Sequence, residues 1–500
     1  MGTRRREGCG RGPPMRGACV AALACRLYCA TVGRSAGWGR HGCWIGSVLP
    51  SSRRLVARCP QLRRQSAPLG GDGSRSAALE AVAGRPESSY LLQLVDTSSC
   101  HFVKDSRQAL LVALEEIRAL LLLQQRRRPN GLVAPGATEL LPVRAGGEEL
   151  PPGRPLLWAL PLPAASDVEV AEIARRAVLL QAAYRPIACG ADAAGAVLDA
   201  EAVISEWSSD ERARSWSLCV RGVHCRSTLA AGAAAELFAS SVGQLGPVRL
   251  EQPEVALALL EEFAADVKIN LLPAELPPAR RVWLAQVMGQ KPKGWLKPYA
   301  LCARPLVCRS TMRPELAFLM ANLAQISDGD AVLDPVCGSG SLLVAAAACG
   351  ATDLWGIDAD PKVLDGSSSV REKSSADIQD VMANFVALKL PLPSLECGDA
   401  LDASCQAYTQ SYDALLADLP YGHREQSFFH QPRELAVGLL EMAARVLRPH
   451  RRSVMMWPEA LAVDAAAMVQ DAGLSLVVVL SCDSSGSQKR RLVVVEQLGQ

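Results

Sequence analysis

The amino-acid sequence predicts an α/β protein in which a mostly parallel seven-stranded sheet, at residues 300–500, follows a smaller α+β region. Three observations support this prediction. Strand and helix patterns alternate regularly in the C-terminal part of the 500-residue chain. A glycine loop joins one of those strands to a helix. The last two strands, 474–481 and 491–497, flank a short loop and therefore pair antiparallel at the end of the sheet.

The composition excludes several classes of protein. Hydrophobic residues make up 49% of the chain, so neither a disordered chain nor a small disulfide-stapled fold fits. The longest apolar stretches, 18–32 and 109–123, contain charged residues, and neither offers the roughly 18 uncharged residues of a membrane helix. The 17 cysteines lack paired C-x-x-C spacings, which predicts reduced thiols in an intracellular protein and no structural metal.

Residues 1–75 differ in charge from the rest of the chain. Residues 1–71 contain thirteen arginines, no lysine and one acid, Glu7, although the whole chain has a formal charge of only +2. Three interpretations fit this segment: an organelle-targeting peptide, a disordered basic arm, or translated upstream sequence. We expect a cytoplasmic protein, or an organellar one if the segment is a transit peptide.

Two regions precede the predicted parallel sheet. The first, 88–190, is expected to contain strands at 90–95, 156–162 and 184–189, helices at 107–124 and 167–180, and a basic loop at 126–153. The second, 191–299, is expected to contain helices at 200–207, 229–242 and 253–263, a strand at 216–223, segments at 248–250, 266–272 and 281–288 that continue the alternation, and a basic turn at 289–297.

The C-terminal region begins with a βαβ unit. Ser310 or Thr311 caps a helix that has Pro314 in its first turn. The unit itself consists of a strand at 331–334, a glycine loop at 336–340, a helix at 341–349 and a strand at 354–358. Further strands are expected at 395–398, 414–417 and 452–457, ahead of the final antiparallel pair.

The glycine loop indicates the kind of ligand. Cys337, Gly338 and Gly340 lie in a tight loop before a helix whose first N–H groups are free to bind an anion. A dinucleotide-binding loop would have a third glycine where this chain has Leu343, and the lysine of a P-loop is absent. The expected ligand is therefore a nucleoside with a small charged tail. S-adenosylmethionine fits, because its carboxylate can meet the N–H groups of the loop.

Aspartates end four successive strands on the same edge of the predicted sheet: Asp334, Asp358, Asp399 and Asp418. Asp334 would bind the cofactor's ammonium group, Asp358 its ribose diol, and Asp399 the amino hydrogens of its adenine. Aspartate is also common in ordinary turns after strands. Four of them along one edge favour a binding site.

The fourth strand ends in A-D-L-P-Y, which predicts methyl transfer to an amino group. Such a group on a purine ring is a poor nucleophile, because its lone pair is delocalised into the ring. Asp418, with the carbonyl of Leu419 or Pro420, can accept both N–H bonds and localise that lone pair. Tyr421 then provides a face on which a flipped base stacks. The alternative is an ordinary proline turn with a core tyrosine, which the glycine loop upstream disfavours.

These motifs resemble a known family. DLPY is similar to the [D/N]-P-P-[Y/F] motif of amino-methyltransferases. Together with RSTMRPELAFLMANLA, DPVCGSGSLLVAAAACGA, GIDADP and the closing SSGSQKRRLVVVE, it makes residues 300–500 resemble the tRNA guanine-10 N2-methyltransferases of eukaryotes. The upstream segments SYLLQLVDTSSCHF, PLLWALPLP and RRVWLAQVMG are more faintly similar to the ferredoxin-like and THUMP regions of that family. Residues 1–75 have no counterpart.

The resemblance implies a fold, a reaction and partners. The fold is a Rossmann-like methyltransferase domain at 300–500, after a ferredoxin-like domain at 88–190 and a THUMP-like region at 191–299. The reaction is S-adenosylmethionine-dependent methylation of the N2 amino group of guanosine 10 in tRNA. The implied partners are tRNA, bound through the THUMP region, and a small zinc-binding activator subunit. The basic turn supplies candidates for phosphate contacts: Lys291, Lys293 and Lys297.

Several alternatives stay open. Leu419 replaces the first proline of the usual tetrapeptide, a change that also occurs in THUMP-bearing guanine methyltransferases. The stretch 424–433 is shorter than the family pattern, so another tRNA position or a small nuclear RNA is an alternative substrate. An amino-methyltransferase of protein glutamine or DNA adenine is a further alternative, because such enzymes use the same tetrapeptide for the same chemistry. A catalytically silent RNA-binding subunit is the alternative outside enzymes, and the retention of Asp334, Asp358 and Asp418 disfavours it.

Overall fold

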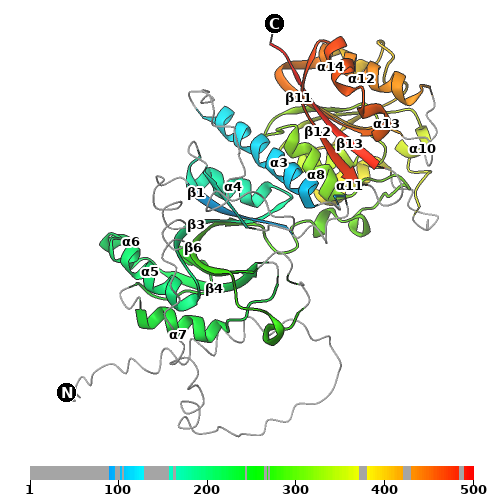
Figure 1. Ribbon diagram of the computed structural model, residues 1–500. Helices are drawn as coiled ribbons and strands as arrows, with labels where there is room; N and C mark the ends of the chain where they lie inside the picture. Colours follow the sequence, from blue (N-terminus) through cyan, green and yellow to red (C-terminus); the bar gives the residue numbers. More distant parts are fainter. Residues whose placement is uncertain are drawn as a thin grey trace, which may run out of the picture. The chain divides into compact units, whose positions relative to one another are not determined.

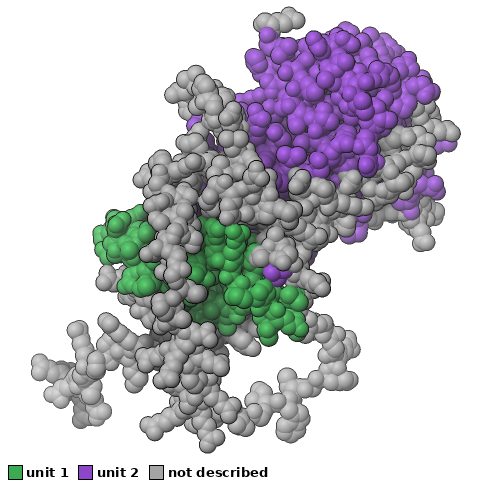
Figure 2. Space-filling model, viewed as in Figure 1, with its two compact units in different colours: residues 1–86, 187–263, 269–285 green, residues 87–186, 264–268, 286–500 purple. Residues whose placement is uncertain are grey.

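The computed structural model has two compact units (Figures 1 and 2). The described residues of the first lie within 187–263 and 269–285, and those of the second within 87–186, 264–268 and 286–500. Residues 88–190, expected as one domain, are thus shared between the units. Among the described residues, no helix is both long and apolar enough to cross a membrane. The structure describes residues 89–95, 102–103, 106–128, 157–161, 165–223, 225–241, 245–263, 267, 271–370, 380–420, 429–483 and 489–499.

Among the described residues, the first sheet has six strands in the order β2-β1-β3-β6-β5-β4. Strand β1 pairs antiparallel with β2 and with β3, whereas β4 and β5 are parallel. The strands are β1 (Ser89–Leu94), β2 (Leu157–Pro161), β3 (Leu180–Gly190), β4 (Trp216–Val223), β5 (Val255–Glu262) and β6 (Arg281–Gln290).

The segment 253–263, predicted to be a helix, is strand β5. Six of its residues are buried, five of them in a row, and such a run has no period that separates a buried strand from a buried helix. Pairing decides the outcome, because β5 runs in register with β4 from Val255 opposite Trp216 to Glu262 opposite Val223. The predicted segment 266–272 lies mostly outside the described residues.

Helices α5 (Ala193–Ser205), α6 (Ser209–Ala213) and α7 (Ala231–Ser241) belong to the first unit. Asp192 begins α5 by accepting a hydrogen bond from the Gly195 amide at 2.8 Å. Trp216 of β4 and Phe238 of α7 lie with their ring centroids 5.0 Å apart in the core of this unit. Burial of this aromatic pair helps to hold α7 on β4.

A buried carboxylate of α3 (Ser106–Arg127) joins α8 (Pro314–Leu323) and the turn that follows α4 (Asp167–Arg176). Glu116 accepts hydrogen bonds from the Val178 amide at 2.6 Å, the Leu179 amide at 3.0 Å and Asn322 Nδ2 at 2.7 Å. Burial raises the pKa of Glu116, and the charge of Lys291 with these hydrogen bonds opposes the rise. The hydrogen bonds of buried Glu116 therefore hold α3 and the turn after α4 against α8.

In the part of the chain that the structure describes, the second sheet has seven strands in the order β12-β13-β11-β10-β7-β8-β9. All described pairings among β7 to β11 are parallel, and β13 is antiparallel to both β11 and β12. This confirms the predicted sheet with its antiparallel last strand. The strands are β7 (Ala331–Asp334), β8 (Asp353–Asp358), β9 (Ser394–Cys397), β10 (Tyr412–Asp418), β11 (Leu447–Pro458), β12 (Leu474–Asp483) and β13 (Lys489–Gln497).

The helices of the second sheet follow its strands. The predicted βαβ unit is present, with α9 ending before Gly350, where φ is +109° and a Cβ atom would meet Asp328. Buried side chains of α12, including Leu439 and Leu440, share one core with those of β10 and β11. The helices are α9 (Ser341–Ala348), α10 (Pro361–Leu364), α11 (Val381–Leu388), α12 (Pro432–Val446), α13 (Glu459–Ala462) and α14 (Ala465–Asp471).

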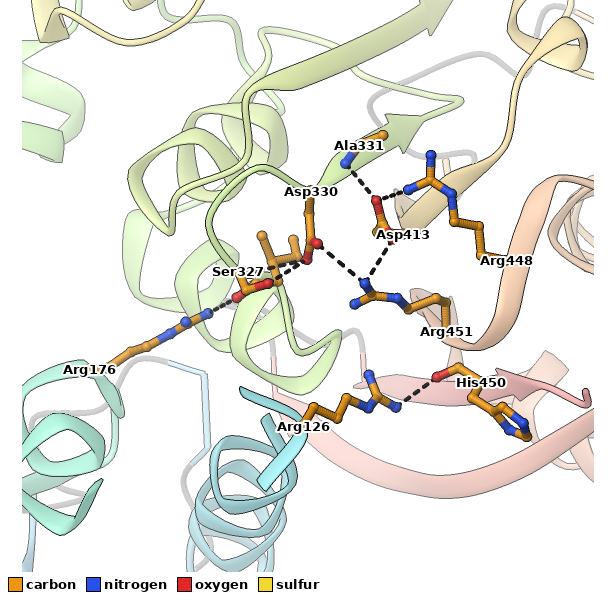
Figure 3. A network of polar contacts seen from close by, with 10 residues as sticks. Arg126, Arg176, Ser327, Asp330, Ala331, Asp413, Arg448, His450 and Arg451 are labelled. Atoms are coloured by element: carbon orange, nitrogen blue, oxygen red, sulfur yellow. Dashed lines mark hydrogen bonds and ion pairs between the residues drawn. The ribbon is translucent and has the colours of Figure 1, made fainter. Parts of the chain in front are cut away.

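A buried acid anchors the amino ends of β7 and β10 (Figure 3). Asp413 accepts a hydrogen bond from the Ala331 amide at 3.0 Å and pairs with Arg451 at 2.9 Å and with Arg448. Its side chain is 5% exposed. These contacts lie at the end of the sheet opposite the one at which Asp334 and Asp418 end β7 and β10.

Replacing Asp413 by Ala should destabilise the protein. The change leaves the Ala331 amide unsatisfied and removes the buried carboxylate that pairs with Arg448 and Arg451, although Arg451 keeps its contact with Asp330. We expect a cost of about 2 to 4 kcal/mol. Urea unfolding of both proteins measures this difference. Arg433→Ala is the control, since Arg433 pairs with Asp464 at an exposed site and should change stability by less than about 1 kcal/mol. Equal effects of the two substitutions would contradict the anchoring role of Asp413.

Candidate active site

The second sheet brings three of the predicted acids together at one edge, the one formed by the carboxyl ends of its parallel strands. Asp334, Asp358 and Asp418 are the last residues of β7, β8 and β10, which are parallel neighbours around β7. Parallel strands end at the same edge, where α/β proteins bind ligands. The charges of Asp358 and Asp418 both act on Asp334, so the three carboxylates form a single electrostatic site.

Asp334 has a buried carboxylate oxygen that is suited to binding a cation. Its side chain is buried, Oδ1 accepts a hydrogen bond from the Val336 amide at 3.2 Å, and buried Oδ2 has no hydrogen-bond partner among the described residues. Burial raises its pKa well above the usual value, the Val336 bond opposes this, and the charges of Asp358 and Asp418 add to the rise. An unpaired buried carboxylate oxygen requires a donor, and the predicted contact with the ammonium group of S-adenosylmethionine would supply one.

The two glycines of the loop are needed for different reasons. Both have positive φ, +53° at Gly338 and +77° at Gly340. A Cβ atom on Gly340 would lie 2.9 Å from Val381 Cγ1, whereas one on Gly338 would have no atom within 4 Å. Gly340 is therefore required for packing at the start of α9. The space beside Gly338 leaves room for a ligand against the backbone.

Cys337, a predicted cofactor contact, is a packing residue in this loop. Its side chain is buried, and its amide donates to the Ile357 carbonyl at 2.8 Å. Burial raises the pKa of the thiol well above its usual value, so the sulfur stays protonated and neutral. Cys337 thus joins the glycine loop to β8, and its cofactor contact remains a prediction.

Asp358 connects the loops after two strands. Its Oδ2 accepts a hydrogen bond from the Gly338 amide at 2.7 Å, and its Oδ1 accepts one from the Asp360 amide at 2.9 Å. An ionised carboxylate has about four acceptor positions. Asp358 can therefore hold the glycine loop and still accept the hydroxyl groups of a ribose.

Asp399 lies just beyond β9 and is held by a histidine that the motifs did not single out. His430 Nε2 lies 2.9 and 2.8 Å from the two carboxylate oxygens, and the Leu401 amide donates to Oδ1 at 3.0 Å. Burial lowers the pKa of His430, but hydrogen bonds and charges from Asp399 and Glu434 outweigh it, and the net shift is upward. The proposed adenine contact of Asp399 would therefore share this carboxylate with His430.

Asp418 is also paired, with Arg490 of β13. Arg490 Nη1 donates to Asp418 Oδ1 at 2.7 Å, and the side chains are 14% and 17% exposed. The next residue, Leu419, is buried in the core, and its amide donates to the Met456 carbonyl at 3.1 Å. A leucine in place of the usual proline therefore has a packing role. Pro420 is half-buried, and Tyr421 lies outside the described residues.

Arg304 is a second residue that the motifs did not single out. Its buried guanidinium donates from Nη1 to Ser341 Oγ at 2.7 Å, at the first residue of α9, and from Nε to the Tyr299 carbonyl at 3.2 Å. Burial lowers its pKa to about 10, so it is still charged at neutral pH. Its charge adds to the positive end of α9 and favours an anionic group there.

The three predicted RNA-binding lysines are in different environments. Lys291 is directed inward, where its Nζ donates to the Val178 carbonyl at 2.5 Å, and burial lowers its pKa to about 8 against the charge of Glu116. We therefore no longer assign it a phosphate contact. Lys293 and Lys297 are exposed, and their contacts with RNA remain predictions.

The parallel sheet, the glycine loop and the acids at the strand ends define a class of protein, the S-adenosylmethionine-dependent methyltransferases. Sequence comparison agrees: residues 302–477 match the family described as UPF0020, RMKL-like, methyltransferase domain. This segment is a methyltransferase domain.

Two proteins that this chain resembles have names that state a reaction. The tRNA (guanine(10)-N(2))-methyltransferase TRMT11 of Rattus norvegicus is 29% identical over 187 residues, 36% of this chain and 39% of that protein. The U6 snRNA (guanine-N(2))-methyltransferase THUMPD2 of Mus musculus is 29% identical over 166 residues, 32% of this chain and 26% of that protein. The match thus spans about two-fifths or less of each relative. The crystal structure of TrmN from Thermus thermophilus has 20% identity and a TM-score of 0.34, with 69% of this chain and 90% of that chain covered.

Proposed function

We propose that this protein transfers a methyl group from S-adenosylmethionine to the exocyclic N2 amino group of a guanosine in tRNA, at position 10. The observation that carries the proposal is Asp418, which ends β10 ahead of Leu419 and Pro420 and shares its edge with Asp334 and Asp358. The names of the relatives support guanine N2 as the acceptor and tRNA as the substrate.

Each residue of the site has a role in the proposed reaction. S-adenosylmethionine, when bound, supplies an electrophilic methyl group. Asp334 holds the ammonium of its tail, Asp358 holds the ribose, and Gly338 leaves room for the ligand. Asp418 accepts a hydrogen bond from the guanine amino group and localises the nitrogen lone pair for attack. The proton released from the amino group passes to Asp418 or to water.

A small nuclear RNA is the second candidate substrate, because THUMPD2 matches this chain at the same 29% identity as rat TRMT11. The full chain should be incubated with methyl-labelled S-adenosylmethionine and either transcribed tRNA or U6 snRNA. Mass spectrometry of the nucleosides should find labelled N2-methylguanosine in the tRNA, and none in a tRNA with adenosine at position 10. Label in U6 snRNA alone would support the second candidate, and label in a different nucleoside would contradict guanine N2 methylation.

The regions before the methyltransferase domain are proposed to bind the RNA. We assign residues 88–190 to a ferredoxin-like domain and 191–299 to a THUMP-like region. Lys293 and Lys297 are exposed in the turn that follows β6, and exposed lysines neutralise phosphates without reading sequence. We also propose a cytoplasmic location, with import into an organelle as the alternative if residues 1–75 are a transit peptide.

A small zinc-binding activator subunit is proposed to cover the outermost strand at one side of the second sheet, rather than the strand ends that carry the acids. Strand β9 is the last strand at this edge, and an edge strand offers backbone groups for pairing with another chain. Apolar side chains are exposed nearby, with Leu392 at 58% and Val386 at 64% exposure. Leu392 lies two residues before β9, and Val386 lies in α11.

Substitution of Leu392 by Lys should weaken binding of this activator. The charge would oppose burial of this position under the activator and reduce recovery of the activator in a co-purification at least tenfold, as expected for an unpaired buried charge. Co-expression with the activator should also raise the soluble yield of the parent chain. Val463→Lys is the matched control, because Val463 is 82% exposed after α13. Equal recovery with Leu392→Lys and Val463→Lys would exclude this edge as the binding surface.

A further inference from the structure

Arg490 stands beside the proposed catalytic acid although it is 72 residues away in the sequence. It lies near the start of β13, which runs antiparallel to β11 with Arg490 opposite Pro458. Asp418 lies at the end of β10, on the other side of β11, in register with Met456. The reversal of β13 therefore brings an arginine to the same edge at which the parallel strands present their acids.

The contact between the two side chains is short and largely buried. Arg490 Nη1 lies 2.7 Å from Asp418 Oδ1, and neither side chain is more than 17% exposed. Three carboxylates meet at this edge, and their charges repel one another. A guanidinium is always charged and planar, so it both offsets this repulsion and fixes the orientation of the carboxylate it binds.

We infer that Arg490 is a positioning residue for methyl transfer, which holds the Asp418 carboxylate in one orientation toward the amino group of the base. This inference rests on the proposed function of Asp418. A charged carboxylate accepts hydrogen bonds and donates none, which is the property that the proposed reaction requires. Arg490 acts through Asp418 and need not touch the base itself.

Single-turnover assays on transcribed tRNA should detect this role in the full chain. Arg490→Ala should lower the rate of methyl transfer about ten- to a hundredfold, the scale of a displaced reacting group. Affinity for S-adenosylmethionine should stay within about twofold. Arg490→Lys should be faster than Arg490→Ala but slower than the parent, because lysine restores the charge but not the planar guanidinium group with its fixed donors. Guanidinium ion added to Arg490→Ala should also restore part of the rate.

A double substitution separates positioning from a direct contact with RNA. If Arg490 acts through Asp418, Arg490→Ala should change the rate less than about twofold once Asp418 is already Ala. Arg491→Ala is the matched control: Arg491 is the next residue of β13 and pairs with Glu459 rather than Asp418, so the parent rate is expected.

Two results would overturn the inference while leaving the proposed function intact. One is a parent rate for Arg490→Ala in an enzyme that needs Asp418. The other is an equal loss from Arg490→Ala with and without Asp418, which would make Arg490 an RNA contact. A parent rate for Asp418→Ala alone would instead overturn the proposed function, and this inference with it.

Discussion

Asp418→Ala should lower the single-turnover rate of methyl transfer to tRNA by roughly a hundredfold or more, the usual loss when a positioned acid–base or electrostatic group is removed. The side chain is the acceptor that localises the lone pair of the amino group, and alanine provides none. Binding of S-adenosylmethionine should change little, because Asp334 and Asp358 provide the proposed contacts to the cofactor. The measurement is a rapid-quench assay with labelled cofactor, run beside a calorimetric titration of the same variant.

Asp418→Asn is the companion variant. It keeps the size and one acceptor oxygen of the side chain but removes the charge that pairs with Arg490. Its rate should therefore lie between those of the parent and Asp418→Ala. If Asp418→Ala transferred methyl groups at the parent rate, the role of this residue in the reaction would be excluded.

Asp358→Ala should weaken binding of S-adenosylmethionine at least tenfold. Two charge-assisted hydrogen bonds to a ribose diol contribute about 1.5 to 3 kcal/mol, and tenfold in affinity corresponds to about 1.4 kcal/mol. The structure adds a second reason, because Asp358 also holds the Gly338 amide at 2.7 Å and its loss releases the glycine loop. Isothermal titration calorimetry of both proteins measures the difference.

Asp353→Ala is the control for that experiment. Asp353 begins the same strand, β8, is exposed, and lies at the end opposite Asp358. Its removal should leave cofactor affinity within about twofold of the parent, as for an exposed side chain outside the site. Unchanged binding after the loss of Asp358 would remove this residue from the cofactor site.

The C-terminal sheet could be predicted from the sequence because the patterns that indicate it lie close together in the chain. Short buried strands, the glycine loop and the acids that end the strands all lie within 331–418, so spacing alone placed Asp334, Asp358 and Asp418 on one edge. Strand β5 could not be predicted in this way. Its buried run has no distinguishing period, and pairing with β4 over a long sequence separation determines its structure.

Arg490 and His430, which contact the predicted acids, could not be predicted either, because their contacts also join residues far apart in the sequence. Arg490 reaches Asp418 across 72 residues, and His430 reaches Asp399 across 31. Nothing in the local pattern around an arginine or a histidine reports such a contact, which depends on strand order. Lys291 shows the converse, since a lysine in a basic turn predicted an exposed phosphate contact and its ammonium group is instead bound to Val178.

The central claim is that the exocyclic amino group of guanosine accepts the methyl group. The most direct test uses two tRNAs that differ at one position, with guanosine or inosine at position 10, because inosine lacks only the 2-amino group. Each is incubated with the full chain and labelled S-adenosylmethionine under single-turnover conditions, and label in the RNA is measured. We predict transfer to the guanosine tRNA and none to the inosine tRNA. Equal labelling of the two would show that the methyl group goes elsewhere and would contradict the proposed reaction.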